Sequence, residues 1–586
     1  MPTLKKISLT PFIRFRNPIF IFLFFFAITT ALNLSYIHMP PVWDSIAVFS
    51  SAIYLYEHSF DFSGLLKQTG YAYGGPNIYS FSLISFLTYF FISITKGNPA
   101  LFLPALHIVQ FLFSAVALTA TFFAASKLFD WRVALLITFA VLFYPLFLVQ
   151  TGYVYTEIAG AALFMCAIYA WASRYFLASV LLAALACMVK SFGIVLICSL
   201  VFLFLIDTAI PRRQRLLWVS TSMLLMIGIE IMTVSSYVHG SFHHICRGYW
   251  LELFSVLDTL DNMPDLFLFV LIVLIMPCVF GLRRAYSRQS APPYHPIDIK
   301  MYRFLLNNNR ISNLLILKAY SLIVRNVGYK IVTVIDTLMV FVRGDTSQRL
   351  VIAVYLVPVF FVGFLAMTPC SSGISVLHLP RYYTWILPII FIGVIYTCKL
   401  FFCRSLKYQP NLSNNNVNRN LVMMLTVLIL FSMLNRDGRF YPSLGYGRNS
   451  FSLTERSFEY LDFYNIQHDS VAGLAKLQNG LPAFVTRGEY YFLSSPLMGY
   501  VKVHLDNIFF ILNKPYSSAK LDDFPDDFIL LNDATNDGHG GDILKNILQS
   551  AKTNPAYSVS ELAQYHRGSY SSSIFRITRR DSLRAL

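Results

Sequence analysis

The chain has 586 residues, of which 56% are hydrophobic and 13% charged, and its formal net charge is +16. Charged residues make up about a quarter of ordinary soluble domains, so this composition excludes a soluble globular protein. Repeated apolar stretches close to the length of a bilayer crossing instead predict a polytopic α-helical membrane protein. The basic residues cluster in short segments between these stretches. Membrane proteins carry an excess of lysine and arginine in their cytoplasmic loops, and this accounts for the positive charge. We therefore do not expect a nucleic-acid partner.

The first apolar segment, Ile19–Leu34, is expected to remain as a membrane anchor, because the start of the chain lacks the small-residue cleavage site of a secretory signal. Pro40 and Pro41 end this segment, since neither can donate the backbone hydrogen bond that continues a helix. The segment is preceded by a cluster of basic residues, Lys5, Lys6, Arg14 and Arg16. The N-terminus is therefore predicted to be cytoplasmic, and Asp44, the first acid of the chain, to be exterior.

Residues 36–98 are predicted to form an exterior segment. Residues 43–57 suit a short surface helix capped by Asp44, and Tyr79–Thr95 could either span or lie in the interface. A cytoplasmic position for Lys127 and Arg132 requires Leu101–Ala125 to run inward. That choice leaves Tyr79–Thr95 on the exterior surface.

The same rule places the later segments and gives about eleven spans in all. The stretch Phe176–Ile206 is read as an out-and-back hairpin with Lys190 at its exterior turn. An exterior loop at 239–264 follows, and 283–348 is predicted to be a basic cytoplasmic insertion. The other expected spans are Arg132–Val149, Ile158–Trp171, Leu216–Val238, Leu266–Leu282, Val351–Met367, Ile386–Leu400 and Leu421–Leu434.

Two domains are expected, a transmembrane domain over 1–435 and a small exterior α/β domain over 436–586. Acids appear in the second part, and two stretches in it, Pro482–Thr486 and Phe528–Leu531, have the pattern of strands. Two helices are predicted in this part, Ser452–Phe463 and Asp542–Ala551.

Asp44 is the leading candidate for chemistry. Aspartate is a preferred residue for capping a helix, and the Ser-Ile-Ala-Val-Phe that follows suits a helix start. The same carboxylate, exterior and next to the membrane, could act as a general base for an acceptor hydroxyl. One residue can fill both roles.

Glu157 and Lys190 are the next candidates. A glutamate in the first turn of a helix complements the helix dipole, with Thr156 as a plausible cap. Lys190 interrupts an apolar stretch, where an ammonium group is costly unless it pairs, lines a cavity or reaches the interface. Its functional interpretation is a point charge for a lipid-linked phosphate.

Three further residues are candidate ligands. Arg381 begins a late span, where it can bind phosphate or anchor the helix in the interface. His243 and His244 could hold a divalent metal ion, although adjacent histidines in a loop are more often solvated. Eight cysteines show no CxxC or metal spacing, and Cys246 and Cys370 could pair if both loops are exterior.

The order of these motifs resembles the GT-C glycosyltransferases, and in particular the bacterial branch related to protein O-mannosyltransferases and lipid A aminoarabinose transferases. The resemblance is carried by four features: an exterior acid after the first span, Thr156-Glu157 heading the fourth, Lys190 after Leu-Ala-Ala-Leu-Ala-Cys-Met-Val, and Arg381-Tyr382 before a late span. The chain departs from these families at Ser45, where an acid commonly follows the first one, and at Gly74-Gly75-Pro76-Asn77.

The resemblance implies transfer of a sugar from a polyprenyl-phosphate donor to a hydroxyl of a lipid, glycan or protein acceptor on the exterior face of the inner membrane. It implies Asp44 and Glu157 as catalytic acids, Lys190 and Arg381 as donor-phosphate ligands, and His243 or His244 as a metal ligand. A transporter or lipid flippase is the alternative, because such proteins also carry charges inside the membrane. A structural membrane protein whose exterior domain binds partners is a third.

Overall fold

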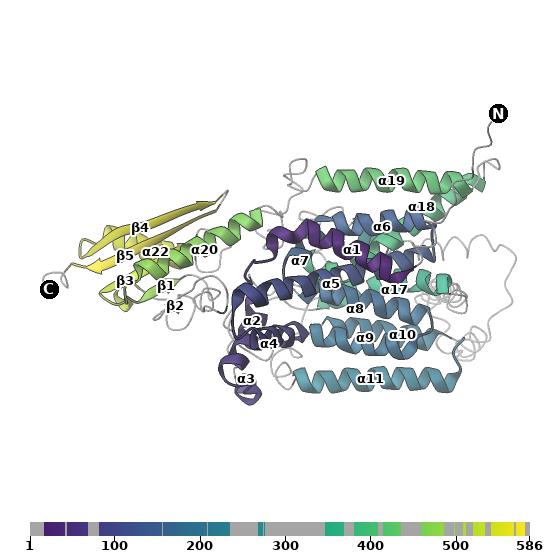
Figure 1. Ribbon diagram of the computed structural model, residues 1–586, viewed down its shortest axis with the longest axis horizontal. Helices are drawn as coiled ribbons and strands as arrows, with labels where there is room; N and C mark the ends of the chain where they lie inside the picture. The colour runs from purple at the N-terminus through teal and green to yellow at the C-terminus, as the bar shows by residue number, and fades with distance from the viewer. Residues whose placement is uncertain are drawn as a thin grey trace, which may run out of the picture.

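A bundle of apolar helices with a small mixed sheet at one end makes up the computed structural model (Figure 1). The structure describes residues 17–41, 44–67, 81–154, 156–190, 192–207, 209–234, 268–273, 275, 346–367, 380–407, 414–434, 459–485, 497, 508–510, 520–533, 541–567 and 570–580.

The bundle begins with α1 (Pro18–Asn33) and the short 3-10 helix η2 (Leu34–Tyr36), and continues through the helices α2 (Asp44–Glu57), α3 (Phe62–Lys67), α4 (Leu83–Ile94), α5 (Pro99–Ser126), α6 (Trp131–Phe143), α7 (Pro145–Gly152), α8 (Thr156–Ala172), α9 (Phe176–Val189), α10 (Gly193–Ile206) and α11 (Arg212–Val234). Its later part consists of α17 (Thr346–Met367), the 3-10 helix η6 (Pro380–Trp385), α18 (Leu387–Lys407) and α19 (Asn414–Leu434).

Side-chain caps fix where several of these helices begin. The side chains of Asn17 and Asn98 accept hydrogen bonds from the backbone at the starts of α1 and α5, and a proline occupies the first turn of each. Asp130 accepts from two backbone amides at the start of α6. These groups satisfy amides that have no partner within the helix, so the short polar residues between apolar runs set the helix boundaries.

The segment expected as one span over Arg132–Val149 is instead two helices. α6 and α7 are bent by 68° where Pro145 follows Tyr144. Proline has no amide hydrogen to donate, and it disfavours the helical conformation in the residue before it. Tyr144 accordingly has extended backbone angles, so the expected span is a bent pair of helices and not one continuous helix.

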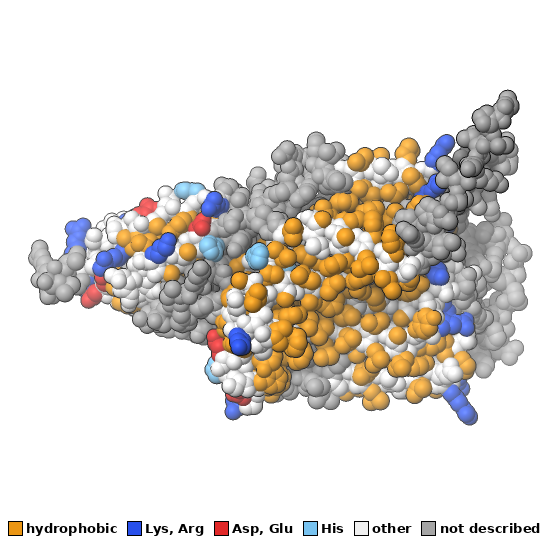
Figure 2. Space-filling model, in the orientation of Figure 1, with side chains coloured by type: hydrophobic (Ala, Val, Ile, Leu, Met, Phe, Trp, Pro, Cys, Tyr) orange, Lys and Arg blue, Asp and Glu red, His pale blue; other side chains and the backbone are white. Residues whose placement is uncertain are grey.

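Apolar side chains cover the flank of the bundle, and lysine and arginine gather at the end away from the sheet (Figure 2). Of the helices in the described ranges, Pro99–Ser126 and Thr346–Leu365 are long and apolar enough to cross a membrane, and the bent pair of α6 and α7 would make a third. Seven further helices are apolar but shorter. The apolar helical bundle is that of a membrane protein, whereas the expected number of about eleven spans is not confirmed.

The helices of the 36–98 segment lie at the sheet end of the bundle (Figure 1). α2 packs against α4, and α4 packs against α5 and α9. Ser82 and Ser85 form a capping box at the start of α4, which therefore begins later than the expected Tyr79. The helix predicted over 43–57 is present as α2, with Asp44 as its first residue, but its described side chains from Val48 to Leu55 are mostly buried, so its expected place on the surface is not confirmed.

The C-terminal part contains a five-stranded sheet in the order β2-β1-β3-β5-β4. β1 pairs in parallel with β2 and β3, whereas β5 is antiparallel to both β3 and β4. The strands are β1 (Ala483–Val485), β2 (Ile508–Phe510), β3 (Asp527–Asp533), β4 (Tyr557–Arg567) and β5 (Tyr570–Arg579). The helices are α20 (Glu459–Leu477), the 3-10 turn η10 (Leu521–Asp523) and α22 (Gly541–Thr553).

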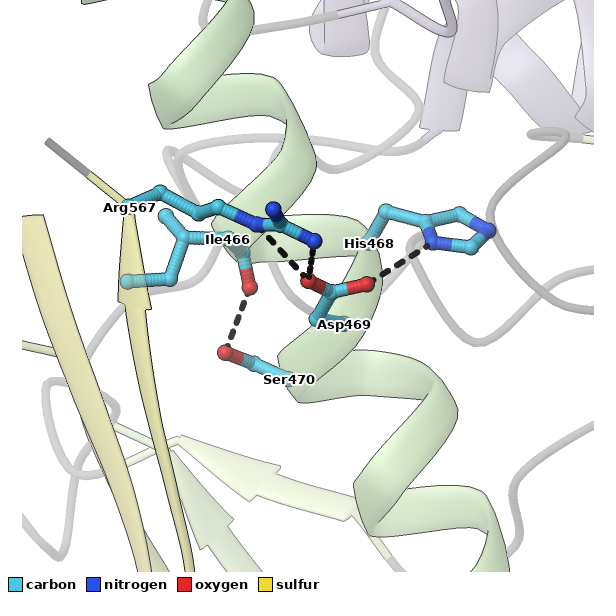
Figure 3. A network of polar contacts seen from close by, with 5 residues as sticks. All are labelled: Ile466, His468, Asp469, Ser470 and Arg567. Atoms are coloured by element: carbon cyan, nitrogen blue, oxygen red, sulfur yellow. Dashed lines mark hydrogen bonds and ion pairs between the residues drawn. The ribbon is translucent and has the colours of Figure 1, made fainter.

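Polar contacts hold α20 against the last two strands (Figure 3). Arg567 on β4 donates to Asp469 Oδ2 from Nη2 at 3.0 Å and from Nε at 3.3 Å. His468 Nδ1 lies 3.6 Å from the other carboxylate oxygen of Asp469. The hydroxyl oxygens of Ser470 and Ser572 are 2.8 Å apart. All of these contacts lie where α20 packs on the sheet, so we give them a structural role and not a catalytic one.

The C-terminal elements agree in part with expectation. β1, β3 and α22 lie where Pro482–Thr486, Phe528–Leu531 and Asp542–Ala551 were predicted. The helix expected at Ser452–Phe463 is α20, which runs on to Leu477, and the residues before Glu459 lie outside the described ranges. The long strands β4 and β5 were not predicted. The expected domain boundary at 435/436 also lies outside the described residues.

Candidate functional site

Glu157 and Lys190 form an ion pair at the sheet end of the bundle. Glu157 lies in the first turn of α8, and Lys190 directly follows α9. Lys190 Nζ is 2.7 Å from Glu157 Oε1, and the side chains are 24% and 0% exposed, respectively. The carboxylate is thus enclosed by protein, while the lysine side chain is partly exposed.

Both carboxylate oxygens of Glu157 have a partner. Besides the contact of Oε1 with Lys190, Oε2 accepts a hydrogen bond from the hydroxyl of Thr156 at 3.1 Å. A buried carboxylate is stable only when it is paired and hydrogen-bonded, and this one is both. The pair explains how a lysine is tolerated between two apolar helices.

Two aromatic rings lie beside the ammonium group of Lys190. Its Nζ is 4.8 Å from the ring centroid of Tyr382 and 5.6 Å from that of Phe192. The two rings meet edge to face with centroids 4.5 Å apart. At these distances the ring faces attract the cation. Tyr382 belongs to η6, so the late segment that carries Arg381 comes next to the lysine.

The helix hairpin with Lys190 at its turn was predicted from the sequence and is confirmed by α9 and α10, which pack against each other. Asp44 begins α2 and Arg381 lies in η6, but the side chains of both are outside the described residues. His243, His244, Cys246 and Cys370 are likewise outside them. The roles of Asp44, Arg381 and the two histidines therefore stay predictions.

His107 was missed by sequence reasoning. It lies on α5, is 1% exposed, and its Nε2 is 2.8 Å from the backbone carbonyl of Met39. This hydrogen bond attaches the loop between α1 and α2 to the bundle. Its acceptor, Met39, lies five residues before Asp44. A histidine inside an apolar span was the available signal.

Two more polar residues lie on the face of α5 that carries His107. Gln110 donates to the backbone carbonyl of Gln150 at 3.3 Å, and the hydroxyls of Ser114 and Thr151 are 3.1 Å apart. Positions 107, 110 and 114 share one helix face because their spacing is three and four residues. This face joins α5 to α7, the short helix before Glu157.

The chemistry available at this end of the bundle is that of a partly exposed cation with a fixed counter-charge. Such a group can neutralise an anionic headgroup without a nucleotide-binding loop. In the ranges that the structure describes, no three histidine, cysteine or acidic residues gather in a way that would hold a metal ion. The described residues thus supply an anion-binding group and do not test the expected metal.

Comparison with known proteins gives a distant likeness only. No protein-family model and no curated protein matches the chain. Two solved structures of ArnT from Cupriavidus metallidurans are similar, one described as bound to undecaprenyl phosphate and one as being in the apo state. The match to the first covers 97% of this chain and 98% of that chain, at 12% sequence identity and a TM-score of 0.44. The match to the second covers 94% of this chain and 97% of that chain, at 12% sequence identity and a TM-score of 0.41. At these values the likeness does not assign a function, so the proposal below is drawn from the residues of this chain.

Proposed function

We propose that this chain is a membrane glycosyltransferase that moves a sugar from a polyprenyl-phosphate donor to a hydroxyl acceptor at the exterior face of the inner membrane. The observation that carries the proposal is the pairing of Lys190 with Glu157 at 2.7 Å, with the Glu157 side chain enclosed and the Lys190 side chain partly exposed. The pair thereby holds the ammonium group of Lys190 in a fixed place where α9 ends.

In this reaction Lys190 stabilises the departing phosphate. The donor's bond between the anomeric carbon and phosphate oxygen breaks while the acceptor oxygen bonds to that carbon, and the phosphate leaves as an anion. A cation held in place beforehand stabilises the charge that develops on the leaving group. Arg381 is the second residue of η6 and directly precedes Tyr382, whose ring lies beside Lys190; it is the proposed second cation.

Asp44 is the proposed general base. It begins α2 in the segment that His107 ties to the bundle through Met39, and its role is to take the proton of the acceptor hydroxyl as that oxygen attacks. Glu157 has no exposed surface in this structure. We therefore assign it the task of holding Lys190 in place instead of contact with the acceptor.

Lipid binding by the purified full-length protein tests the proposal. The double variant Lys190→Met/Glu157→Gln removes both charges and keeps the side-chain lengths, so no unpaired buried charge is left behind. We expect its affinity for polyprenyl phosphate to fall at least tenfold, about 1.4 kcal/mol.

Lys399→Met is the matched control. Lys399 also sits beside an aromatic ring, that of Phe129 at 5.1 Å, and donates to the carbonyl of Leu128 at 2.6 Å, in the loop between α5 and α6. Its loss should leave lipid affinity unchanged. Equal affinities for the wild type and the Lys190→Met/Glu157→Gln variant would remove Lys190 from the donor site, and failure of the wild type to bind the lipid would remove the function.

Topology provides a second test. The proposal places 436–586 outside and the insertion 283–348 inside, following the basic residues. Single cysteines introduced at position 300 and near the C-terminus should react with a membrane-impermeant maleimide only at the second site in intact cells. Labelling of both from the same side contradicts an exterior catalytic face.

A further inference from the structure

Gly160 on α8 lies directly beneath the indole ring of Trp385. A Cβ atom built at position 160 would overlap three carbon atoms of that ring. Glycine has no Cβ, so here it permits a close approach of the helix backbone to a large side chain. Gly160 follows Glu157 by three residues, and positions three apart share a helix face. Trp385 is thus seated on the same face of α8 that carries the partner of Lys190.

Ring packing, rather than hydrogen bonding, holds Trp385. Its indole meets Phe164 and Phe192 edge to face, with centroids 6.4 Å and 6.3 Å apart. The indole nitrogen of Trp385 and the hydroxyl of Thr384 are both buried, and neither has a hydrogen-bond partner among the described residues. The position of η6 along α8 is therefore set by the shape of the contact at Gly160.

The same short helix carries Tyr382. In a 3-10 helix residues three apart lie above one another, so Trp385 and Tyr382 project from the same side of η6. Trp385 contacts α8 and Tyr382 faces the ammonium group of Lys190 at 4.8 Å. η6 is therefore connected to α8 in two ways. Trp385 packs on Gly160 of α8, and Tyr382 lies beside Lys190, which pairs with Glu157 of α8.

We propose that Gly160 and Trp385 are positioning residues of the donor-phosphate site, whose contact fixes where Tyr382 and the neighbouring Arg381 stand relative to Lys190. This inference deepens the proposed function and rests on it. A glycine that merely lets two helices pack predicts a loss of stability alone. A positioning role predicts that the surroundings of Lys190 change as well.

Gly160→Ala is the first variant. Alanine favours a helix over glycine, so any loss must come from the displaced indole. We expect the dissociation constant for polyprenyl phosphate to rise at least tenfold. Gly363→Ala is the matched control, because Gly363 is also inside an apolar helix, α17, and a Cβ there meets nothing within 4 Å. Its affinity should stay within twofold of the wild type.

Two measurements separate positioning from packing. The acylation rate of the Lys190 amine, followed by mass spectrometry without lipid, should rise at least threefold in Gly160→Ala as Tyr382 moves away. Adding Trp385→Phe to Gly160→Ala makes room for the methyl group, so the affinity of the double variant should return to within threefold of Trp385→Phe alone. Trp385→Phe also serves as the test variant if Gly160→Ala does not fold, and it too should alter the acylation rate.

A Gly160→Ala protein with a lower melting temperature but wild-type affinity and acylation rate overturns the inference. Absence of rescue in the Gly160→Ala/Trp385→Phe double variant does so as well. If the wild type binds no polyprenyl phosphate, the proposed function fails, and the acylation rates still decide whether Gly160 and Trp385 position Tyr382.

Discussion

Arg349 on α17 and Asp207 at the end of α10 form a second buried ion pair, with Nη2 2.7 Å from Oδ2. The side chains are 1% and 0% exposed. The guanidinium carbon also lies 5.8 Å from the ring centroid of Trp171. α10 begins beside Lys190 and ends at Asp207, so the two pairs sit at opposite ends of the same helix, about 20 Å apart at 1.5 Å per residue.

The Asp207–Arg349 pair should matter for stability and not for lipid binding. Arg349→Met leaves a buried carboxylate without its counter-charge, which costs about 3–5 kcal/mol for pairs of this kind. Adding Asp207→Asn removes the stranded charge and keeps the acceptor for the amide of Ala209, now bonded at 3.1 Å. The double variant should therefore unfold at a higher temperature than Arg349→Met.

The measurement is thermal unfolding of the detergent-solubilised protein beside polyprenyl-phosphate affinity. A double variant less stable than Arg349→Met would show that Asp207 stabilises the fold by more than its pairing with Arg349. Loss of lipid affinity in well-folded protein would place the Asp207 end of α10 in the donor site.

The two members of the Glu157–Lys190 pair should not be equivalent. Lys190→Ala leaves the fully enclosed carboxylate of Glu157 unpaired, so we expect a loss toward the upper part of the range of about 3–5 kcal/mol. Glu157→Gln leaves a lysine whose side chain is 24% exposed and whose ammonium group lies beside the ring of Tyr382, so we expect a loss of about 1 kcal/mol. Melting temperatures of the two single variants check the order. Equal losses would mean that the two ends of the pair are equally desolvated.

Local sequence patterns predicted the helices on which the site stands. The stretch Phe176–Ile206 was too long for one span and had a lysine at its middle, which was enough to place the turn of the hairpin. The helix beginning at Asp44 followed from two prolines and an acid before an apolar run. Both signals lie within a few residues, where propensity and capping decide the structure.

The contacts that make the site are between distant parts of the chain and carried no such signal. Glu157 and Lys190 were each singled out, but their pairing depends on how α8 packs on α9. Gly160 and Tyr382 were not singled out as site residues, because a glycine in a helix and a tyrosine before a span are ordinary in membrane proteins. Only the packing of η6 on α8 brings them together.

The strands β4 and β5 escaped prediction for a different reason. Their residues do not alternate cleanly: β5 opens with Tyr570-Ser-Ser-Ser, and β4 has an irregularity between Glu561 and Ala563 that shifts which side chains face the core. A bulge changes the phase of a two-residue period, so the alternation expected of a strand is lost in the sequence.

Asp527 should make the sheet sensitive to acid. The hydrogen bond from Arg576, followed by that from Thr578, holds the pKa of Asp527 below its ordinary value. A carboxylate with a depressed folded-state pKa contributes stability that is present above its unfolded pKa of about 3.9 and is lost as the pH falls through the folded value. The stabilisation of the wild type relative to Asp527→Asn should thus be constant from pH 8 to about 5 and shrink below about 4.

Hydrogen exchange of the β3 and β5 amides in the full chain measures this difference locally. Glu561→Gln, at an exposed carboxylate on β4, is the control and should show no such pH dependence. Because Arg576 is 45% exposed, the effect is expected to be small, and high salt should reduce it. A difference that grows as the pH falls below 4 would contradict the assigned sign.

Asp44→Asn tests the proposed base. Asparagine caps a helix about as well as aspartate, so the start of α2 and the amount of folded protein should be preserved. The base role predicts unchanged affinity for polyprenyl phosphate with turnover lowered by about 10²–10⁴-fold, the usual contribution of general acid–base catalysis. Turnover is read as the rate at which cells lacking the gene regain the missing envelope sugar when the variant is supplied.

Asp61→Asn is the matched control for Asp44→Asn. Asp61 lies in the same segment and also caps a helix, since its side chain accepts from the amide of Gly64 at 2.9 Å and from the hydroxyl of Ser63 at 3.1 Å. Replacing it should leave turnover near the wild-type value. The control thus shows whether loss of any acid or helix cap in this segment lowers turnover, or only loss of Asp44. A fully active Asp44→Asn protein would remove the base from the mechanism. The charges at this end of the bundle would then favour the alternative of a transporter, for which lipid or solute movement in vesicles is the decisive assay.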